Sequence, residues 1–436
     1  MCARYVIINP SNSAKAFDVH LAKRPHRPHH RVMPDPIFDA HNIADWRAAT
    51  ERFLKGKPLK TLTRETVGGV ARGPLFTAAD LPEVLAPTSR TNAPLLDGRP
   101  WHILAPVRDS DIAVANAQLL EDLEGGASAA RICVGDGEVQ LSRPADLSRL
   151  LEGVFTDLIP ITFSPNPGSL ATTRLALDTP CLQAAHVSLG MNPLVTSDLP
   201  ELPENWNRFA LAPRKVHEAG GDVVHELAAL AAITAQASRL HGADAVQSSS
   251  IVELASEKDA HIGIAKLRAA RRITARIFES FGLDHTSVTL HSIGSRRDMQ
   301  SIDPWSNLLR VMTAGFGAVV GGADAVLTRP FTDGYGRATG VGHRIARNMQ
   351  LMMMEESHLG QVHDPAFGSY WHESLTDRLA QKAWSLFQTI EAQGGFTCFD
   401  FDPLIAKART ARAAAPLIGV NLHPIPDDVP MPEVRT

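Results

Sequence analysis

The chain has 436 residues, 44% of them hydrophobic and 21% charged, a composition that excludes an intrinsically disordered protein and allows a sizeable core. With 43 basic and 47 acidic side chains, the net charge of −4 argues against a nucleic-acid-binding protein. The four cysteines form no C-x-x-C pair, which argues against a disulfide framework or a zinc knuckle and favours the reducing cytoplasm.

The first hundred residues predict a segment that precedes the main domain. Residues 1–34 lack the apolar core of a signal peptide, and we predict a disordered tail whose HRPHH run at 26–30 is solvated. Residues 35–98 predict an N-terminal helix and an extended arm. Within them, 38–62 has the apolar spacing of one amphipathic helix, and a proline-punctuated stretch follows it.

Eight short β-like runs alternate with helix-like segments between residues 99 and 425. These runs are 101–107, 129–135, 158–164, 184–190, 208–213, 246–252, 287–293 and 324–330. Most of the segments between them have apolar residues at helical spacing and glycine near their ends. Repeated strand-then-helix units predict an α/β protein with a closed parallel (β/α)8 or TIM barrel, a closing helix, and a C-terminal tail at 426–436.

Alternate positions in the middle strands are small or polar. One parity includes Thr162, Ser188, Ala210, Ser248 and His291, and much of the other parity is bulkier and more apolar. If the small parity faces inward, the barrel axis is open and wet and admits a long, thin ligand. If the bulky parity faces inward, the axis is filled, as is usual in TIM barrels. The pattern alone leaves both alternatives open.

Several motifs resemble the adenosylcobalamin-dependent acyl-CoA mutases, above all the methylmalonyl-CoA mutase family. They include DPWSNLLRVMTAGFGAVVGGADAVLTRPF (303–331), and the most specific are RIARNMQ (344–350), EESHLG (355–360) and DPAFGSY (364–370). LPENW (202–206), HEAGG (217–221), IAKLRAARR (264–272) and LIGVN (417–421) extend the resemblance over most of 35–425. The resemblance implies a barrel whose open, hydrophilic axis admits the pantetheine arm of coenzyme A.

The resemblance also implies where the cofactor binds. In the family, adenosylcobalamin is held by a flavodoxin-like domain that is downstream of the barrel or on another chain. The present sequence contains no D-x-H-x-x-G segment, the cobalt-ligating motif of that domain. We therefore expect no cobalamin-binding domain and no cofactor-binding residue on this chain, and a large partner subunit that carries adenosylcobalamin.

Positions that match the catalytic residues of the family hold other residues here. The Tyr beside the cofactor becomes Pro106, and the Tyr-His pair before the EAG turn becomes Arg214 and Lys215. The carboxylate-binding Arg after the sixth strand becomes Ser249, and the Gln after the seventh becomes Ile293. A neutral histidine that supports carbonyl migration is thus replaced by a cation that cannot shuttle protons near neutral pH. We predict no catalytic residue.

Some polar residues are expected to line the remains of the pocket. These candidates are His217, Glu218, Ser248, His291 and Asp333, of which Asp333 lies where the catalytic chains have a Glu near the corrin. His217 and His225 also raise the question of a metal, but no third ligand is evident, and we predict the start of a helix instead. The basic run at 266–272 predicts a helix whose cations face solvent or a partner.

The resemblance implies a small, non-catalytic subunit of a heterodimeric methylmalonyl-CoA mutase. The holoenzyme interconverts (R)-methylmalonyl-CoA and succinyl-CoA, with the radical chemistry in the large subunit. One alternative is a catalytic barrel that works with a separate cobalamin-binding chain, which fits the missing domain but not the replaced residues. Another is a regulatory protein that binds a coenzyme A ester. We expect no nucleic-acid or membrane partner.

Overall fold

The computed structural model describes residues 41–82, 98–135, 137–165, 169–195, 200–283, 288–413, 415–426 and 429–435. The predicted disordered tail at 1–34 lies outside these residues. The chain divides into two compact units, Met1–Thr61 and Leu62–Thr436. Within the described residues, no helix combines the length and the apolar character that a membrane span requires.

The described part of the first unit contains one α-helix, α1 (Ile43–Leu54). It begins after Asn42, whose side chain accepts a hydrogen bond of 2.7 Å from the backbone N of Ala44. It ends at Lys55, which has φ 49°, and a separate 3-10 turn follows at Leu59–Leu62. The prediction of one helix through residue 62 is therefore wrong, because the left-handed backbone at Lys55 ends the α-helix.

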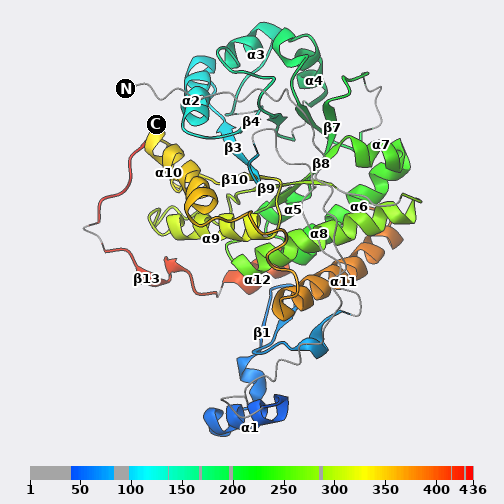
Figure 1. The fold of residues 1–436 in the computed structure, drawn as a ribbon, viewed down its shortest axis with the longest axis vertical. Helices are drawn as coiled ribbons and strands as arrows, with labels where there is room; N and C mark the ends of the chain where they lie inside the picture. Colours follow the sequence, from blue (N-terminus) through cyan, green and yellow to red (C-terminus); the bar gives the residue numbers. More distant parts are fainter. Residues whose placement is uncertain are drawn as a thin grey trace, which may run out of the picture. The chain divides into compact units, whose positions relative to one another are not determined.

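Eight parallel strands close into a barrel in the second unit, as the alternating pattern predicts (Figure 1). The strand order is β10-β3-β4-β5-β6-β7-β8-β9. The strands are β3 (His102–Val107), β4 (Ala129–Ile132), β5 (Ile161–Phe163), β6 (Val187–Met191), β7 (Trp206–Leu211), β8 (Ser250–Ala255), β9 (Thr289–Ile293) and β10 (Ala325–Leu327). The fold is thus a TIM barrel of the α/β class.

The sixth barrel strand lies later in the chain than predicted. Residues Ala243–Ser248 form a short helix, α7, and β8 starts only at Ser250. Gly242 has φ 85° and lets the chain turn from one helix directly into the next. The predicted strand ends at residue 252 and so excludes the charged Glu253, which lies inside β8.

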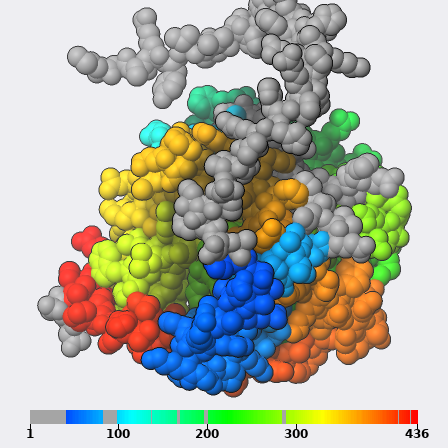
Figure 2. All heavy atoms as spheres, turned by 60° about the horizontal axis from the view of Figure 1, so that its bottom comes forward, coloured from blue at the N-terminus to red at the C-terminus, as the bar shows by residue number. Residues whose placement is uncertain are grey.

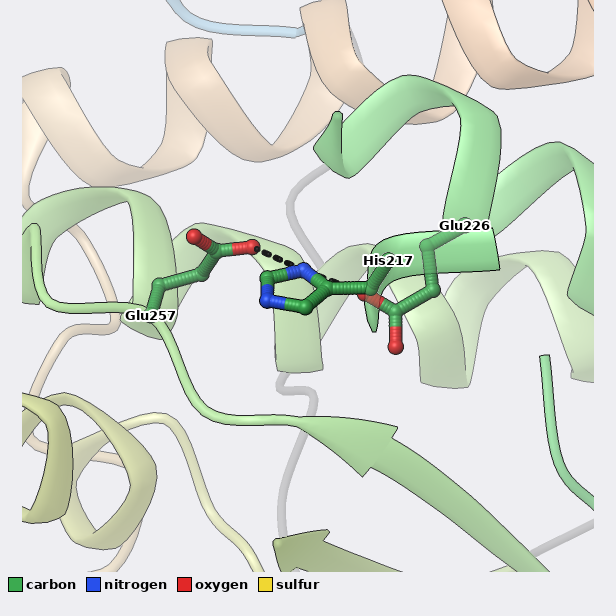
Figure 3. Close-up of side chains that lie close together, drawn as sticks. All are labelled: His217, Glu226 and Glu257. Carbon is green, nitrogen blue, oxygen red and sulfur yellow. Dashed lines mark ion pairs between the residues drawn. The ribbon is translucent and has the colours of Figure 1, made fainter. Parts of the chain in front are cut away.

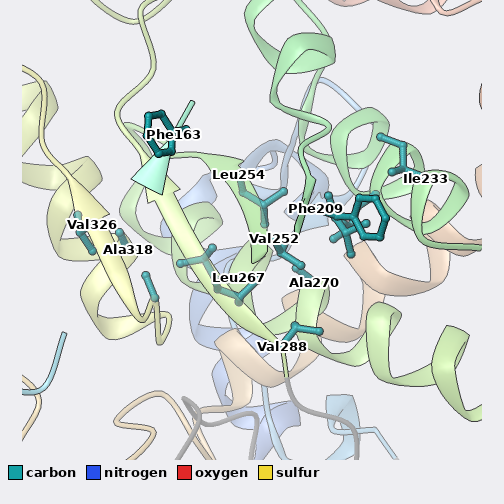
Figure 4. Close-up of a cluster of buried hydrophobic side chains, with 14 of the residues drawn as sticks. Phe163, Phe209, Ile233, Val252, Leu254, Leu267, Ala270, Val288, Ala318 and Val326 are labelled. Carbon is teal, nitrogen blue, oxygen red and sulfur yellow. The ribbon is translucent and has the colours of Figure 1, made fainter. Parts of the chain in front are cut away.

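Helices cover the outside of the barrel. They are α2 (Ile112–Glu124), α3 (Pro144–Leu150), α4 (Ser169–Leu177), α6 (Val223–His241), α8 (Ala260–Ser280), α9 (Asn307–Val320), α10 (Gly340–Leu351) and α11 (Tyr370–Ala392). The main core lies between them and the strands, and Figure 4 shows part of it around Val252, Leu254 and Leu267. Since α11 packs across both α6 and α8, α6 is buried on nearly every side.

The segment that follows the first unit packs on α11. Strands β1 (Arg64–Glu65) and β2 (Ala71–Arg72) form a small antiparallel pair. Lys382 Nζ donates to the carbonyl of Gly69 at 2.8 Å, and the rings of Phe76 and Trp371 lie 5.4 Å apart. Figure 2 shows this light-blue segment beside the orange atoms of α11. This segment therefore covers part of the closing helix, α11.

Further short elements complete the second unit. Helix α12 (Asp402–Ala413) precedes the pair β12 (Ile418–Gly419) and β13 (Leu422–Pro424). Strand β14 (Val434–Arg435) pairs antiparallel with β11 (Arg337–Ala338), and Arg435 binds Asp109 at 2.6 Å. The last described residues are thus attached to the carboxyl end of the barrel.

The small, polar parity of most middle strands faces the barrel interior. Strands β4 and β8 occupy opposite places in the ring, yet Arg131 of β4 contacts Glu253 of β8, so both side chains point inward. Residues that pair in register on neighbouring strands point to the same face of the sheet. Thr162 and Ser188 therefore point inward like Arg131, and His291 points inward like Glu253. This inward alternative is confirmed for those strands.

The axis is nevertheless crossed by side chains. Besides the Arg131–Glu253 ion pair, a separate apolar cluster fills part of the interior, made of Leu104, Ala129, Ile293, Ala325 and Leu327. The expectation of an open, wet axis is therefore wrong for the described residues. Small residues such as Thr162 and Ser188 leave space on the axis, but the long side chains of Arg131 and Glu253 span it from opposite strands.

Candidate functional site at the carboxyl end of the barrel

An ion-paired triad, made of Arg131, Glu253 and Arg214, lies in the barrel interior below the carboxyl ends of the strands. Sites of TIM barrels are found at this end. Arg131 Nη2 lies 2.9 Å from the carboxylate of Glu253, and Arg214 Nε donates to the same carboxylate at 2.9 Å. Burial alone would raise the pKa of Glu253, but Arg131 and Arg214 lower it. Glu253 is therefore an ionised carboxylate held between two guanidinium groups.

Arg214 belongs to helix α5 (Arg214–Glu218), which follows β7 directly. Its Nη1 also lies 3.3 Å from Glu218, whose carboxylate accepts hydrogen bonds from the backbone N atoms of Arg296 and Arg297. Glu218, a predicted pocket residue, therefore connects α5 to the loop after β9. Lys215 is exposed on α5. Arg214 and Lys215, which match the family's Tyr-His pair, thus have different environments, since Arg214 is ion-paired and Lys215 is exposed.

A second ion-paired group lies after β3 and β10. Asp333 accepts hydrogen bonds from Arg108 at 2.9 Å and from Arg329 at 2.7 Å, and Arg108 also binds Glu138. A pocket of about 50 Å³ lies here, and its lining includes Pro106, Arg108 and Asp333. Asp333 thus lies at the carboxyl end of the barrel and lines a small pocket, and its carboxylate is shared by two arginines.

A third group surrounds His217 (Figure 3), a residue of α5 that is fully buried. Its Nε2 lies 3.0 Å from Ser295 Oγ, and its Nδ1 lies 3.4 Å from Glu226 and 3.3 Å from Glu257. The ammonium of Lys266 contacts both carboxylates and lies 3.0 Å from Glu257. We call His217, Glu226, Glu257 and Lys266 the buried charge cluster.

The buried charge cluster balances its own charges. Burial lowers the pKa of Lys266 and raises that of Glu226, but their mutual attraction reverses both effects, so that the pKa of Glu226 falls to about 2. Burial also lowers the pKa of His217, yet Glu257 and Glu226 raise it above its ordinary value. The ammonium of Lys266 and the imidazole of His217 thus both stabilise the ionised form of the two carboxylates.

His217, Glu226 and Glu257 also have the residue types and proximity of a metal site. Lys266, however, already supplies a cation to both carboxylates, and a metal ion would have to displace it. His225, the other histidine considered for a metal, accepts a hydrogen bond of 3.2 Å from the backbone N of Asp222. Asp222 caps α6, so the predicted helix start is confirmed.

Other predicted site residues face the interior. Pro106 pairs in register with Arg131 and therefore shares its inward face. Ile293 belongs to the interior apolar cluster. Burial lowers the pKa of His291 to about 4, although Glu253 opposes the effect, so the imidazole is neutral near pH 7. These three residues lie near the ion-paired triad.

Ser248 and Ser249 do not lie at this site. Ser248 is exposed on α7, and Ser249 Oγ donates to the carbonyl of Ala245 at 2.7 Å. Both precede β8, so they lie at its amino end, opposite the candidate site. The prediction that Ser248 lines the pocket, and the match of Ser249 to a position after the sixth strand, are wrong because the strand starts later than predicted.

The apolar pattern of the strands does not predict the ionisable residues that fill the interior, and the prediction that the cations of the basic run on α8 face solvent or a partner is wrong. Lys266, Arg268 and Arg271 are buried with acidic partners and do not face solvent. The available signal was a charged residue within a short apolar run, namely Arg131 in AARI and Glu253 in IVELA. Such a residue in a buried strand requires a partner of opposite charge.

The chain is similar to known proteins of one family. The family model for methylmalonyl-CoA mutase matches residues 199–400. The chain is 37% identical to the "Probable methylmalonyl-CoA mutase small subunit" of Mycobacterium bovis, over 79% of this chain and 62% of that protein. It is 31% identical to the methylmalonyl-CoA mutase small subunit of Streptomyces virginiae (83% and 66%) and 32% identical to that of Propionibacterium freudenreichii (81% and 62%). The chain thus spans 62 to 66% of the length of these relatives.

Proposed function

We propose that the chain, which is similar to the methylmalonyl-CoA mutase family, is the small, non-catalytic subunit of a heterodimeric methylmalonyl-CoA mutase. In this proposal a large partner subunit interconverts (R)-methylmalonyl-CoA and succinyl-CoA in the cytoplasm. The names of the relatives support the assignment to a small subunit. The present chain contributes a folded barrel that stabilises its partner.

The observation that carries the proposal is the Arg131–Glu253 ion pair. It joins opposite strands, and the two side chains are 2% and 1% exposed. A pantetheine arm on the axis would have to separate these charges and leave both buried without a partner, which costs several kcal/mol. Arg214, at the position of the family's Tyr, adds a second cation to Glu253. The ion-paired triad therefore opposes the entry of a coenzyme A ester.

The family depends on adenosylcobalamin, whose bound form supplies a carbon radical for the rearrangement. The described residues at the carboxyl end of this barrel do not fit the group. Asp333 is committed to Arg108 and Arg329, and His217 is buried with hydrogen-bonding groups at both ring nitrogens. We propose that the partner chain alone holds the cofactor and that no radical step involves the residues of this barrel.

The residues of this chain have a structural role in the proposal. The buried charge cluster joins α5, α6 and α8 to the loop after β8, and the ion-paired triad joins β4, β8 and α5. Both groups fix the carboxyl end of the barrel without a substrate. A rigid barrel of this kind presents a constant outer surface to a partner.

Co-expression with a cobalamin-binding mutase chain tests the proposal. We expect the two chains to co-purify, the isolated small chain to bind neither adenosylcobalamin nor methylmalonyl-CoA in equilibrium dialysis, and succinyl-CoA formation to depend on the large chain's site. Inactivating the large chain's active site by mutation should abolish turnover.

Isomerisation that persists in that complex would instead favour a catalytic barrel working with a separate cobalamin-binding chain. Binding of methylmalonyl-CoA by the small chain alone, without co-purification, would favour a regulatory protein.

A further inference from the structure

A pocket of about 280 Å³ lies at the other end of the barrel, between the end of α9 and the loop 357–369. Its lining includes Val319 and Val320 of α9 and, from the loop, His358, Leu359 and His363. Gly322, which also lines it, shortly precedes β10, so the pocket lies at the amino ends of the strands. The proposed function does not use this pocket, and its loop contains part of the most specific family motif.

Buried ion pairs hold the loop in place. Arg268, whose side chain is 0% exposed, binds both Asp364 of the loop and Glu373 of α11. Glu373 also accepts a hydrogen bond of 3.2 Å from the backbone N of Gly368. The backbone N of Leu359 donates to the carbonyl of Met353 at 2.9 Å. Both ends of the loop are thus anchored to helices, and the pocket is formed in advance of any ligand.

The loop also contains unfavourable backbone conformations. His358 has φ 53° and Asp364 has φ 45°, values that non-glycine residues seldom adopt. Strained residues persist where the surrounding structure fixes them, and they are frequent at binding sites. Both strained residues line the pocket, and the ion pair of Asp364 with Arg268 explains how its strain is maintained.

We propose that this pocket binds a small amphipathic carboxylate. Val319, Val320, Leu359 and Val362 offer an apolar wall for a short hydrocarbon or aromatic body, and the imidazoles of His358 and His363 offer N–H donors for a carboxylate. The volume lies just below the roughly 300–1,000 Å³ typical of drug-sized ligands, so the ligand is small. This inference is independent of the proposed function, because the pocket and the ion-paired triad lie at different places in the barrel.

Other ligand classes fit less well. A phosphorylated ligand requires lysine or arginine, and the described lining contains neither. A pure hydrocarbon would leave the N–H donors of the two exposed histidines, His358 and His363, unused. A cation lacks a free carboxylate, because Asp364 is already bound to Arg268. An acid with an apolar body can pack against the apolar wall and accept hydrogen bonds from the imidazoles.

Isothermal titration calorimetry of the full chain with octanoate, and with 1-octanol as the neutral counterpart, tests the proposal. We expect octanoate to bind with a dissociation constant below about 1 mM and at least about tenfold more tightly than octanol. Val320→Trp, which fills the pocket, and the double variant His358→Asn with His363→Gln should each weaken octanoate binding at least about tenfold. Asn is chosen because it tolerates the left-handed backbone.

Two further variants complete the experiment. Val341→Trp, at an exposed position on α10 outside the pocket lining, is the matched control and should leave octanoate binding unchanged. Val362→Trp fills the pocket from an exposed loop position and replaces Val320→Trp if that variant does not fold. Absence of octanoate binding to the folded chain, equal affinity for octanol, or unchanged affinity in the filled variant would each overturn the proposal.

Discussion

Arg131 and Glu253 lie on opposite strands of the barrel, yet their side chains meet at 2.9 Å in the interior. The residues are 122 positions apart in the chain, and the contact depends on the closure of the barrel. Because Glu253 also binds Arg214, one buried carboxylate is shared by the buried guanidinium group of Arg131 and the partly buried one of Arg214. The interior is therefore held by charge as well as by apolar packing.

Removing the shared carboxylate should destabilise the fold strongly. Glu253→Gln leaves the buried Arg131 without a counter-charge and Arg214 with Glu218 alone, and we expect the free energy of unfolding to fall by about 3–5 kcal/mol. Replacing all three residues by apolar ones, Arg131→Met, Glu253→Leu and Arg214→Met, should restore most of that loss. Urea unfolding of the single and triple variants measures both effects. A triple variant less stable than Glu253→Gln would contradict this account.

The buried ammonium of Lys266 should be equally important. Lys266→Met removes the cation that Glu226 and Glu257 share, and the expected loss is about 3–5 kcal/mol in the free energy of unfolding. Lys407→Met, at an exposed position on α12, is the matched control and should change that free energy by less than about 0.5 kcal/mol. Similar denaturation midpoints for both variants would refute the stabilising role of the buried charge cluster.

Stability should depend on pH through His217. Because Glu257 and Glu226 raise the pKa of His217 against the effect of burial, its imidazolium stabilises the fold fully below the unfolded pKa of about 6.5. This contribution is lost as the pH rises through the raised pKa. The difference in unfolding free energy between the wild type and His217→Gln should therefore shrink as the pH is raised from about 6 to about 9. A constant or growing difference would show that the imidazolium does not stabilise the cluster.

Restoring the family's Tyr-His pair should not restore catalysis. In Arg214→Tyr with Lys215→His, the Arg131–Glu253 ion pair still crosses the axis, and Pro106 and Ile293 are unchanged. We expect no succinyl-CoA when this variant is mixed with a large subunit whose own site has been inactivated. Thermal unfolding serves as a control that the variant is folded. Measurable succinyl-CoA formation would mean that the interior still admits the substrate.

The barrel could be predicted from the sequence because each strand-helix unit has a local pattern. The local pattern failed at the sixth strand, because the residues just before Ser250 form helix α7, which follows α6 directly after Gly242. It also failed for Arg131 and Glu253, whose partners lie in distant units. The cations of α8 were predicted to be exposed, since Glu226, Asp324 and Glu373 belong to other elements. Pairing across the fold is not encoded in periodicity.

Because the Arg131–Glu253 contact is shielded from solvent, dissolved ions reach it far less than they reach exposed pairs such as Arg239 with Glu391. High ionic strength should therefore weaken polar contacts on the outer surface while it leaves the middle of the molecule unchanged. A salt wash is thus a gentle way to separate this chain from a charged companion and recover it intact.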